Sequence, residues 1–135
     1  MYRRFRLKKI LILDDEQAVR QSFSDYFEDH LWQPIQAESA EDALMMLQNE
    51  HPLAAIIDVR LPGMDGTDFI RELANRQLTI ACVICTGSPE FDLPVDFHDL
   101  TIVSNRIFKK PVSDLSALEN EVSRVLASLS HEGNH

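Results

Sequence analysis

The chain of 135 residues is long enough to form one domain of ordinary size that closes its own core. Its composition, with 44% apolar and 26% charged residues, is that of a globular protein, and no apolar run approaches the roughly 20 residues that span a bilayer. The formal net charge of −9 argues against nucleic acid as a partner of the folded body, because phosphate backbones attract Lys and Arg.

The two ends of the chain differ in composition from its body. Residues 1–7 form a basic extension, and the apolar stretch that follows it, ILIL, is too short for the core of a signal peptide. We therefore expect a cytoplasmic protein with no membrane partner, in which residues 8–130 form the domain and residues 131–135 form a polar tail.

Four short runs rich in Ile, Val and Leu recur along the chain and are bounded by polar or turn residues. This pattern is typical of strands that are buried on both faces. The runs are KKILIL (8–13), LAAIIDV (53–59), TIACVIC (79–85) and the shorter SNRIF (104–108). A weaker strand is predicted for residues 31–35.

Segments with apolar residues at helical spacing separate these runs. They cover residues 16–30, a stretch that begins after the predicted cap Ser39, residues 67–74 and residues 113–129. A fourth helix in chain order is expected between the last two strands, but Pro89 and Pro94 interrupt that segment, so we expect it to be short or irregular. Strands that alternate with helices predict an α/β fold, with a parallel sheet, helices on both faces and about five of each element.

The two cysteines, Cys82 and Cys85, lie three residues apart within one predicted strand. Residues at this spacing point to opposite faces of a strand, so the two thiols cannot meet. No second Cys or His pair lies at metal spacing. We therefore interpret both as reduced, structural residues.

Polar residues stand where the main predicted strands end. Asp14 and Asp15 close the first run, Asp58 lies near the end of the third strand, Thr86 closes the fourth, and Lys110 follows the fifth. The carboxyl ends of parallel strands lie along one edge of a sheet, where ligands of open α/β sheets bind. These five residues are therefore expected to converge in one pocket.

A pocket of this composition has a definite chemistry. Three carboxylates repel one another unless a cation lies among them, and Mg²⁺ is a hard ion that carboxylates, carbonyls and waters satisfy. A lysine adds a positive charge suited to a phosphate oxygen, and a threonine adds a hydroxyl donor. The set suits phosphoryl transfer to an aspartate.

The same residues lie in motifs that resemble the receiver domains of response regulators in two-component signalling. The four segments are LILDDE (11–16), IIDVRLPGMDG (56–66), CTG (85–87) and KKP (109–111), and they occur in the family's order and close to its spacings. The similarity covers about residues 8–130. It implies a flavodoxin-like, doubly wound, five-stranded parallel sheet in the order 2-1-3-4-5, like that of the chemotaxis regulator.

The resemblance also implies roles for the residues of the pocket. Asp58 corresponds to the phosphoacceptor and Asp15 to a direct ligand of Mg²⁺. Asp14 assists, directly or through water, and the main-chain carbonyl of Arg60 corresponds to a further ligand. Thr86 and Lys110 are then expected to hold the phosphoryl oxygens.

Lys110 is chosen over Lys109 because it directly precedes Pro111, and because alternation places Lys109 on the other side of the strand. In the family this Lys–Pro bond is usually cis, whereas about one X–Pro bond in twenty is cis in folded proteins generally.

Three features depart from the family. Ile107, followed by Phe108, stands where receivers commonly carry the Tyr or Phe that turns inward on phosphorylation. Arg60, two residues after Asp58, is an unusual choice, and we hypothesise that its guanidinium contacts the phosphoryl group or screens attacking water. The proline-containing fourth-helix segment gives a common partner-binding face of the family its own shape.

The leading interpretation is a phosphorylation-dependent switch that receives its phosphoryl group from a histidine kinase or phosphotransfer protein. It catalyses only its own phosphorylation and dephosphorylation, and it acts on an output partner that the sequence leaves open, with a phosphorylation-dependent homodimer as one form. The alternative is an interaction module on the same fold that works without phosphorylation, which Ile107 favours. A hydrolase of the haloacid dehalogenase class needs a second acid where Arg60 stands, so this third reading is disfavoured.

Overall fold

The computed structural model describes residues 6–132, and the side chains of residues 6–130. Most of the predicted basic extension (1–7) and most of the predicted polar tail (131–135) therefore lie outside the described residues. Within the described chain, no helix is long and apolar enough to cross a membrane.

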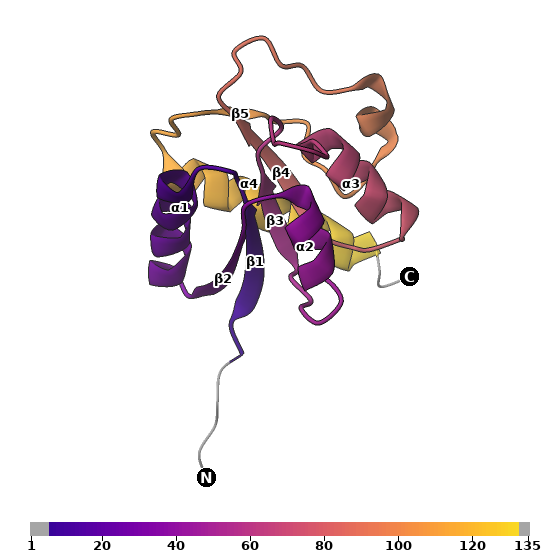
Figure 1. Cartoon of the computed structure of the whole chain (residues 1–135). Coiled ribbons are helices and arrows are strands. Elements are labelled where there is room, and N and C mark those ends of the chain that lie inside the picture. The colour runs from indigo at the N-terminus through magenta and orange to yellow at the C-terminus, as the bar shows by residue number, and fades with distance from the viewer. Residues whose placement is uncertain (1–5, 133–135) are drawn as a thin grey trace.

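A five-stranded parallel sheet forms the centre of the molecule, with the strand order β2-β1-β3-β4-β5 (Figure 1). This confirms the predicted fold class and strand order. The strands are β1 (Lys8–Leu13), β2 (Trp32–Ala37), β3 (Ala54–Ile57), β4 (Ala81–Thr86) and β5 (Phe108–Lys109). All residues of β3 and β4 are buried, as the continuous apolar runs predict for strands covered on both faces.

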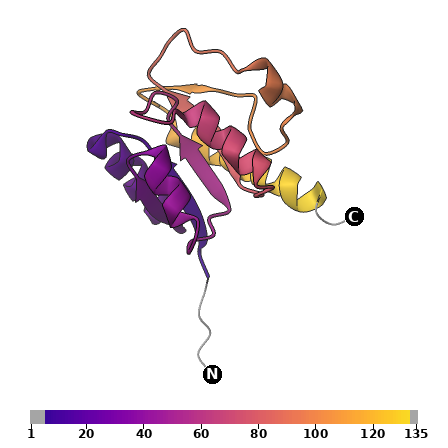
Figure 2. The same cartoon turned by 45° about the vertical axis from the view of Figure 1, so that its right-hand side comes forward.

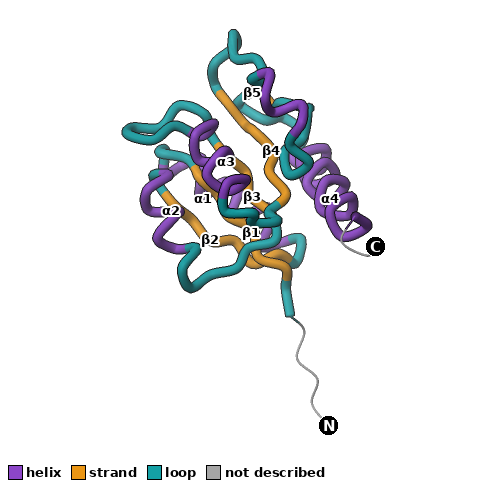
Figure 3. Tube along the Cα trace, turned by 90° about the vertical axis from the view of Figure 1, so that its right-hand side faces the viewer, coloured by secondary structure: helices purple, strands orange, loops and turns teal. Residues whose placement is uncertain are grey.

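Four α-helices cover the two faces of the sheet. They are α1 (Gln17–Asp29), α2 (Ala40–Met46), α3 (Gly66–Asn75) and α4 (Leu115–Glu132). Helices α1 and α4 share one face, where the hydroxyl of Tyr26 donates to Glu119 at 3.2 Å, and α2 and α3 lie on the other (Figures 1 and 3). The predicted cap of α2 is present, because the main-chain amide of Asp42 donates to Ser39 Oγ at 3.0 Å.

The fourth-helix position is occupied by a short 3₁₀ helix, η1 (Val95–Asp99), which follows a long irregular loop that begins at the carboxyl end of β4 (Figure 2). This confirms the predicted irregularity, and Pro94 lies directly before η1. Phe97 anchors η1 in the core with no exposed surface. Arg71 of α3 lies 5.0 Å from the centre of the Phe97 ring and bonds Asp96 at 2.9 Å.

Four strands differ from their predicted bounds, with small shifts for β3 (predicted 53–59) and β4 (predicted 79–85) and larger ones for β2 and β5. Leu31 has a φ of +68° and ends the turn after α1, so β2 begins one residue later and extends to Ala37. The last strand was predicted over residues 104–108, but β5 covers Phe108–Lys109, so only Phe108 of the predicted run is in the strand. An isolated bridge joins Val103, directly before the predicted run, to Cys82 of β4. Between this bridge and β5 the chain bends around Ser104, whose hydroxyl bonds Glu121 of α4.

Both cysteines lie in the core as free thiols. Burial raises the pKa of each, so neither is poised to react as a thiolate.

Candidate functional site

The strand ends fix the backbones of the principal site residues. The amide of Asp14 donates to β2 at 3.2 Å, that of Asp58 donates to β1 at 2.9 Å, and that of Lys110 donates to β4 at 2.8 Å. Each residue thus makes a strand-to-strand hydrogen bond just beyond the last residue of its own strand. The sheet therefore sets the spacing of these side chains before any of them interact.

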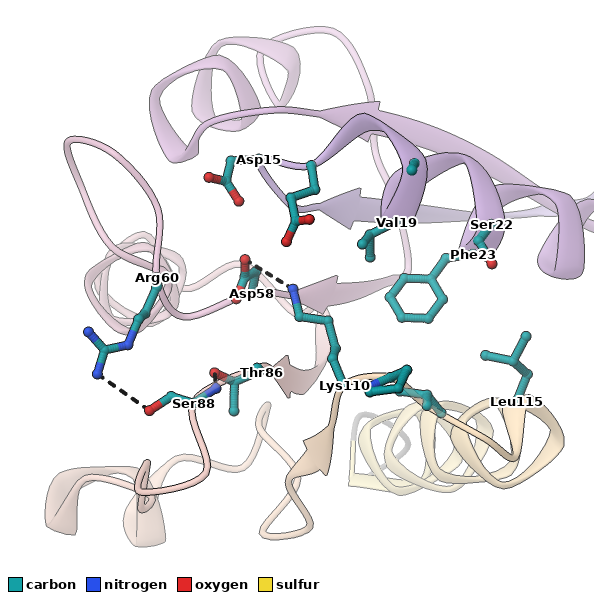
Figure 4. Close-up of a pocket in the computed structure, with 15 residues that line it drawn as sticks. Asp15, Val19, Ser22, Phe23, Asp58, Arg60, Thr86, Ser88, Lys110 and Leu115 are labelled. Atoms are coloured by element: carbon teal, nitrogen blue, oxygen red, sulfur yellow. Dashed lines mark hydrogen bonds and ion pairs between the residues drawn. The ribbon is translucent and has the colours of Figure 1, made fainter.

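The ammonium of Lys110 lies between two buried carboxylates. Its Nζ is 3.3 Å from Asp58 Oδ2 (Figure 4). The same Nζ is 2.7 Å from Asp14 Oδ2. The side chains of Asp14 and Asp58 are 3% and 6% exposed, so neither charge is well solvated by water. One cation thus partly neutralises two acids that would otherwise repel each other.

The titration of this group follows from its geometry. Burial raises the pKa of the Asp58 carboxyl, and the charge of Asp14 raises it further, while Lys110 only partly counters both effects. Burial alone would lower the pKa of Lys110, but its hydrogen bond to Asp14 and the two nearby carboxylates raise it above its usual range. The negative charge of ionised Asp58 is thus only partly neutralised by the cations of the protein itself.

An acidic cluster forms beside this ion pair. Oxygens of Asp14, Asp15 and Glu16 lie within 4.8 Å of one another, and Asp15 and Glu16 are exposed. Carboxylates at this spacing are the hard oxygen ligands that Mg²⁺ takes, so the cluster fits that ion. The sequence interpretation overlooked Glu16, although it directly follows the two aspartates.

The loop that carries the cluster is braced from within and from α1. Asp14 Oδ1 accepts from the amide of Glu16 at 2.9 Å, and Arg20 Nη1 donates to the main-chain oxygen of Asp14 at 2.7 Å. Both bonds hold the acids at the edge of the sheet without using the free oxygens of Asp15.

Thr86 ends β4 with its side chain fully buried. Its Oγ1 accepts a hydrogen bond from the amide of Ser88 at 3.1 Å, so its own hydroxyl hydrogen is free to be donated elsewhere. Across the pocket mouth, Arg60 Nη2 lies 3.4 Å from Ser88 Oγ (Figure 4). Ser88 is a second residue that the sequence interpretation did not single out.

The start of α3 is packed against the backbone of Asp58. A Cβ on Gly66 would lie 2.1 Å from the Asp58 main-chain oxygen, a distance that no side chain can adopt. The Gly66 amide also donates to Val59 at 2.8 Å. The glycine in the motif therefore allows the helix to approach the loop that presents Asp58.

The segment after β5 has the features expected from its sequence. The Lys110–Pro111 bond is cis. Lys109, one residue earlier, bonds main-chain carbonyls of the loop between β4 and η1, whereas Lys110 bonds the two aspartates. Ile107 is half-buried against the core, and Phe108 is buried beneath the guanidinium of Arg106 at 4.4 Å.

Most of the residues predicted for the site line an open cavity of about 650 Å³. Asp15, Asp58, Arg60, Thr86 and Lys110 all contribute to its wall (Figure 4). Of the residues singled out from the sequence, Asp14 lies outside this lining, because its buried carboxylate bonds Lys110 and the Glu16 amide from below.

The raised pKa of Asp58 predicts the pH dependence of stability in the absence of divalent ions. A carboxyl whose pKa is higher in the folded than in the unfolded state destabilises the fold as the pH rises through that pKa. We therefore expect Asp58→Asn to be more stable than the wild type at pH 7, with the difference vanishing below pH ~4, the ordinary pKa of Asp. Lys110 keeps Asp14 as its partner in this variant.

Urea unfolding at a series of pH values in EDTA measures this difference. Asp29→Asn, a change at an exposed residue of α1, serves as the matched control and is expected to follow the wild type. An Asp58→Asn protein that is less stable than the wild type at neutral pH would contradict this account of the site.

Comparison with known proteins shows to which family the chain belongs. The sequence profile of the family described as the response regulator receiver domain matches residues 10–122. Sporulation initiation phosphotransferase F of Bacillus subtilis is 28% identical over 119 residues, which cover 88% of this chain and 94% of that protein. A protein-glutamate methylesterase/protein-glutamine glutaminase of Paramagnetospirillum magneticum is 30% identical over 111 residues, which cover 81% of this chain but only 32% of that protein.

Solved structures show the same fold. A CheY-like receiver domain protein from Methanospirillum hungatei superposes with a TM-score of 0.78 at 24% identity, covering 94% of this chain and 99% of that one. The response regulator TrrA from Thermotoga maritima, solved in complex with Mg²⁺ and BeF, superposes with a TM-score of 0.76 at 18% identity, covering 88% and 99%. By its sequence profile, strand order and strand-end residues, the chain belongs to the response regulator receiver domain family of two-component systems.

Proposed function

We propose that this domain is a phosphorylatable switch that accepts a phosphoryl group on Asp58. The observation that carries the proposal is the ion pair between Asp58 and Lys110, 3.3 Å apart, at the wall of an open pocket next to an acidic cluster. Family membership and the relative named as a phosphotransferase support it. The donor is a phosphohistidine of a histidine kinase or phosphotransfer protein.

Each residue has a separate task in the transfer. A carboxylate oxygen of Asp58 forms the new bond to phosphorus as the bond from phosphorus to the donor's histidine nitrogen breaks. Lys110 pairs with a phosphoryl oxygen, and the free hydroxyl hydrogen of Thr86 is donated to another. The protein contributes positioning and charge neutralisation, which dominate phosphoryl transfer.

Mg²⁺ is the cofactor that the donor set fits. Asp15 and Asp58 would hold it directly, with the main-chain carbonyl of Arg60, and Asp14 assists from its buried position. Exposed Glu16 is a candidate to hold one of its waters. When bound, the ion neutralises the carboxylates and the negative charge of the transferred group.

The cavity beside Asp58 supports docking of a helical phosphodonor. It extends from the acidic loop along α1 to the segment after β5, where its walls are apolar side chains such as Val19, Phe23, Val112 and Leu115. A phosphodonor helix with an apolar face can contact these walls while its phosphohistidine reaches Asp58.

Other parts of the proposal concern the whole chain. We assign residues 8–130 to the receiver domain, place it in the cytoplasm, and expect neither nucleic acid nor a membrane as its partner, in keeping with a net charge of −9. It turns over no substrate beyond its own phosphoryl group. The proposal includes an output partner and a phosphorylation-dependent homodimer, for both of which the side formed by η1, β5 and α4 is a candidate surface.

A phosphorylation-independent interaction module on the same fold is the second candidate. Half-buried Ile107 in place of an aromatic residue, together with the short η1, favours it. The two candidates differ in what they predict for the pocket, because only the switch needs Asp58 to take a phosphoryl group.

Binding of beryllofluoride, a phosphoryl mimic, distinguishes them. We expect saturable binding that requires Mg²⁺ and is lost in Asp58→Asn, because this change removes the carboxylate to which beryllium bonds. Amide NMR shifts measure binding and report which face responds. Asp29→Asn is the control that should bind like the wild type, and absence of binding at high Mg²⁺ would favour the phosphorylation-independent module.

Arg60 is proposed to lengthen the life of the phosphorylated state. Its exposed guanidinium lies at the pocket mouth and is held loosely by Ser88 at 3.4 Å, so it can contact the phosphoryl group or screen attacking water. We expect Arg60→Asn to dephosphorylate about fivefold faster, the effect of about 1 kcal/mol for an exposed charged contact. Arg76→Asn, which removes an exposed arginine from the end of α3, is the control. Equal rates for the wild type and Arg60→Asn would refute this role.

A further inference from the structure

Lys109 makes an unusual set of contacts for an exposed lysine. Its ammonium donates to three main-chain carbonyls of one loop: Ser88 at 3.0 Å, Phe91 at 3.2 Å and Pro89 at 3.4 Å. An ammonium has three hydrogens to donate, so the loop oxygens can satisfy all of them. A surface lysine whose ammonium is solvated by water does not make several hydrogen bonds to one loop, and its four-carbon stem stays free to move.

The loop that Lys109 binds has little structure of its own. Residues 87–94, between β4 and η1, form neither helix nor strand, and Pro89 and Pro94 have no amide hydrogen to donate. The Phe91 amide makes only a long bond of 3.4 Å to Ser88. Lys109 therefore supplies three of the contacts that fix the path of this loop.

The loop in turn positions two groups at the wall of the phosphoryl pocket. The Ser88 amide bonds Thr86 Oγ1 at 3.1 Å, and the Ser88 hydroxyl accepts from Arg60 at 3.4 Å. Lys109 holds the carbonyl of this same serine. Ser88 thus links the Lys109 ammonium to a hydroxyl and a guanidinium of residues that line the same pocket as Asp58, with the Arg60 guanidinium directed at Ser88 (Figure 4).

The next residue, Lys110, relates the contacts of Lys109 to the pocket that contains Asp58. Lys109 pairs with Thr86 in the strand register, and the Lys110 amide donates to the Thr86 oxygen at 2.8 Å. Strand alternation directs Lys110 to Asp14 and Asp58 and directs Lys109 to the loop. Two adjacent residues at the end of β5 thus carry cations with different partners: Lys110 bonds Asp58, and Lys109 bonds the loop.

We propose that Lys109 is a positioning residue for phosphoryl binding: by bonding the carbonyls of Ser88, Pro89 and Phe91 it fixes the loop whose Ser88 bonds Thr86 and Arg60 at the wall of the pocket. This rests on the proposed function, since it assigns Lys109 a role in that same site. Lys109 touches neither the acidic cluster nor Asp58, so its contribution concerns the phosphoryl group and leaves the Mg²⁺ ligands unchanged.

The test is Lys109→Met, which keeps most of the stem and removes the ammonium. We expect the hydrogen-bonded amides of Ser88 and Phe91 to exchange with solvent about tenfold faster, because charge-assisted hydrogen bonds to their loop are lost. Beryllofluoride affinity at saturating Mg²⁺ should fall about tenfold for the same reason. The affinity for Mg²⁺ alone, measured by titration of the same amide shifts, should stay within about twofold, because its ligands are untouched.

Lys9→Met is the matched control, because Lys9 of β1 bonds the half-buried Glu50 and lies on a strand that does not contact the loop. It should leave loop exchange and beryllofluoride affinity at their wild-type values. The proposal is overturned if Lys109→Met leaves either quantity unchanged, or if it weakens Mg²⁺ and beryllofluoride equally, as general damage to the site would. A wild-type protein that binds no beryllofluoride would instead overturn the proposed function itself.

Discussion

The site depends on the contact between the Lys110 ammonium and the buried carboxylates of Asp14 and Asp58. The parallel sheet brings these acids together at one edge, where burial and mutual repulsion disfavour two negative charges. Lys110 offsets that repulsion but leaves the pKa of Asp58 raised. A further cation would therefore neutralise the remaining negative charge of the pocket, and the exposed acids Asp15 and Glu16 lie where such a cation can bind.

Much of this architecture could be predicted because it follows from local patterns. Apolar runs bounded by polar residues predicted β1, β3 and β4. Because these strands are parallel, the residues that follow their carboxyl ends lie at one edge of the sheet. The remaining features have different origins. The bend before β5 includes a contact between distant segments, Ser104 with Glu121, which spacing alone does not encode. The turn before β2 requires a positive φ at Leu31, which apolar spacing does not reveal, whereas Glu16 directly follows the two aspartates and could have been found from the sequence.

Two departures from the family, Ile107 and the short η1, lie outside the lining of the pocket, whereas the third, Arg60, contributes to its wall. Ile107 offers no hydroxyl, and η1 replaces a full helix, anchored by Phe97 and Arg71. The loop between the pocket and η1 is instead held by the Lys109 ammonium. In this domain, main-chain contacts of one loop connect the pocket that contains Asp58 with η1.

Direct phosphorylation tests the central claim that Asp58 is the phosphoacceptor. Intact-mass spectrometry after incubation with acetyl phosphate should show the gain of one phosphoryl group by the wild-type chain, dependent on Mg²⁺. Peptide mapping should place that group on Asp58, and Asp58→Asn should gain none. A wild-type chain that stays unmodified at high Mg²⁺, or a phosphoryl group on another residue, would contradict the account.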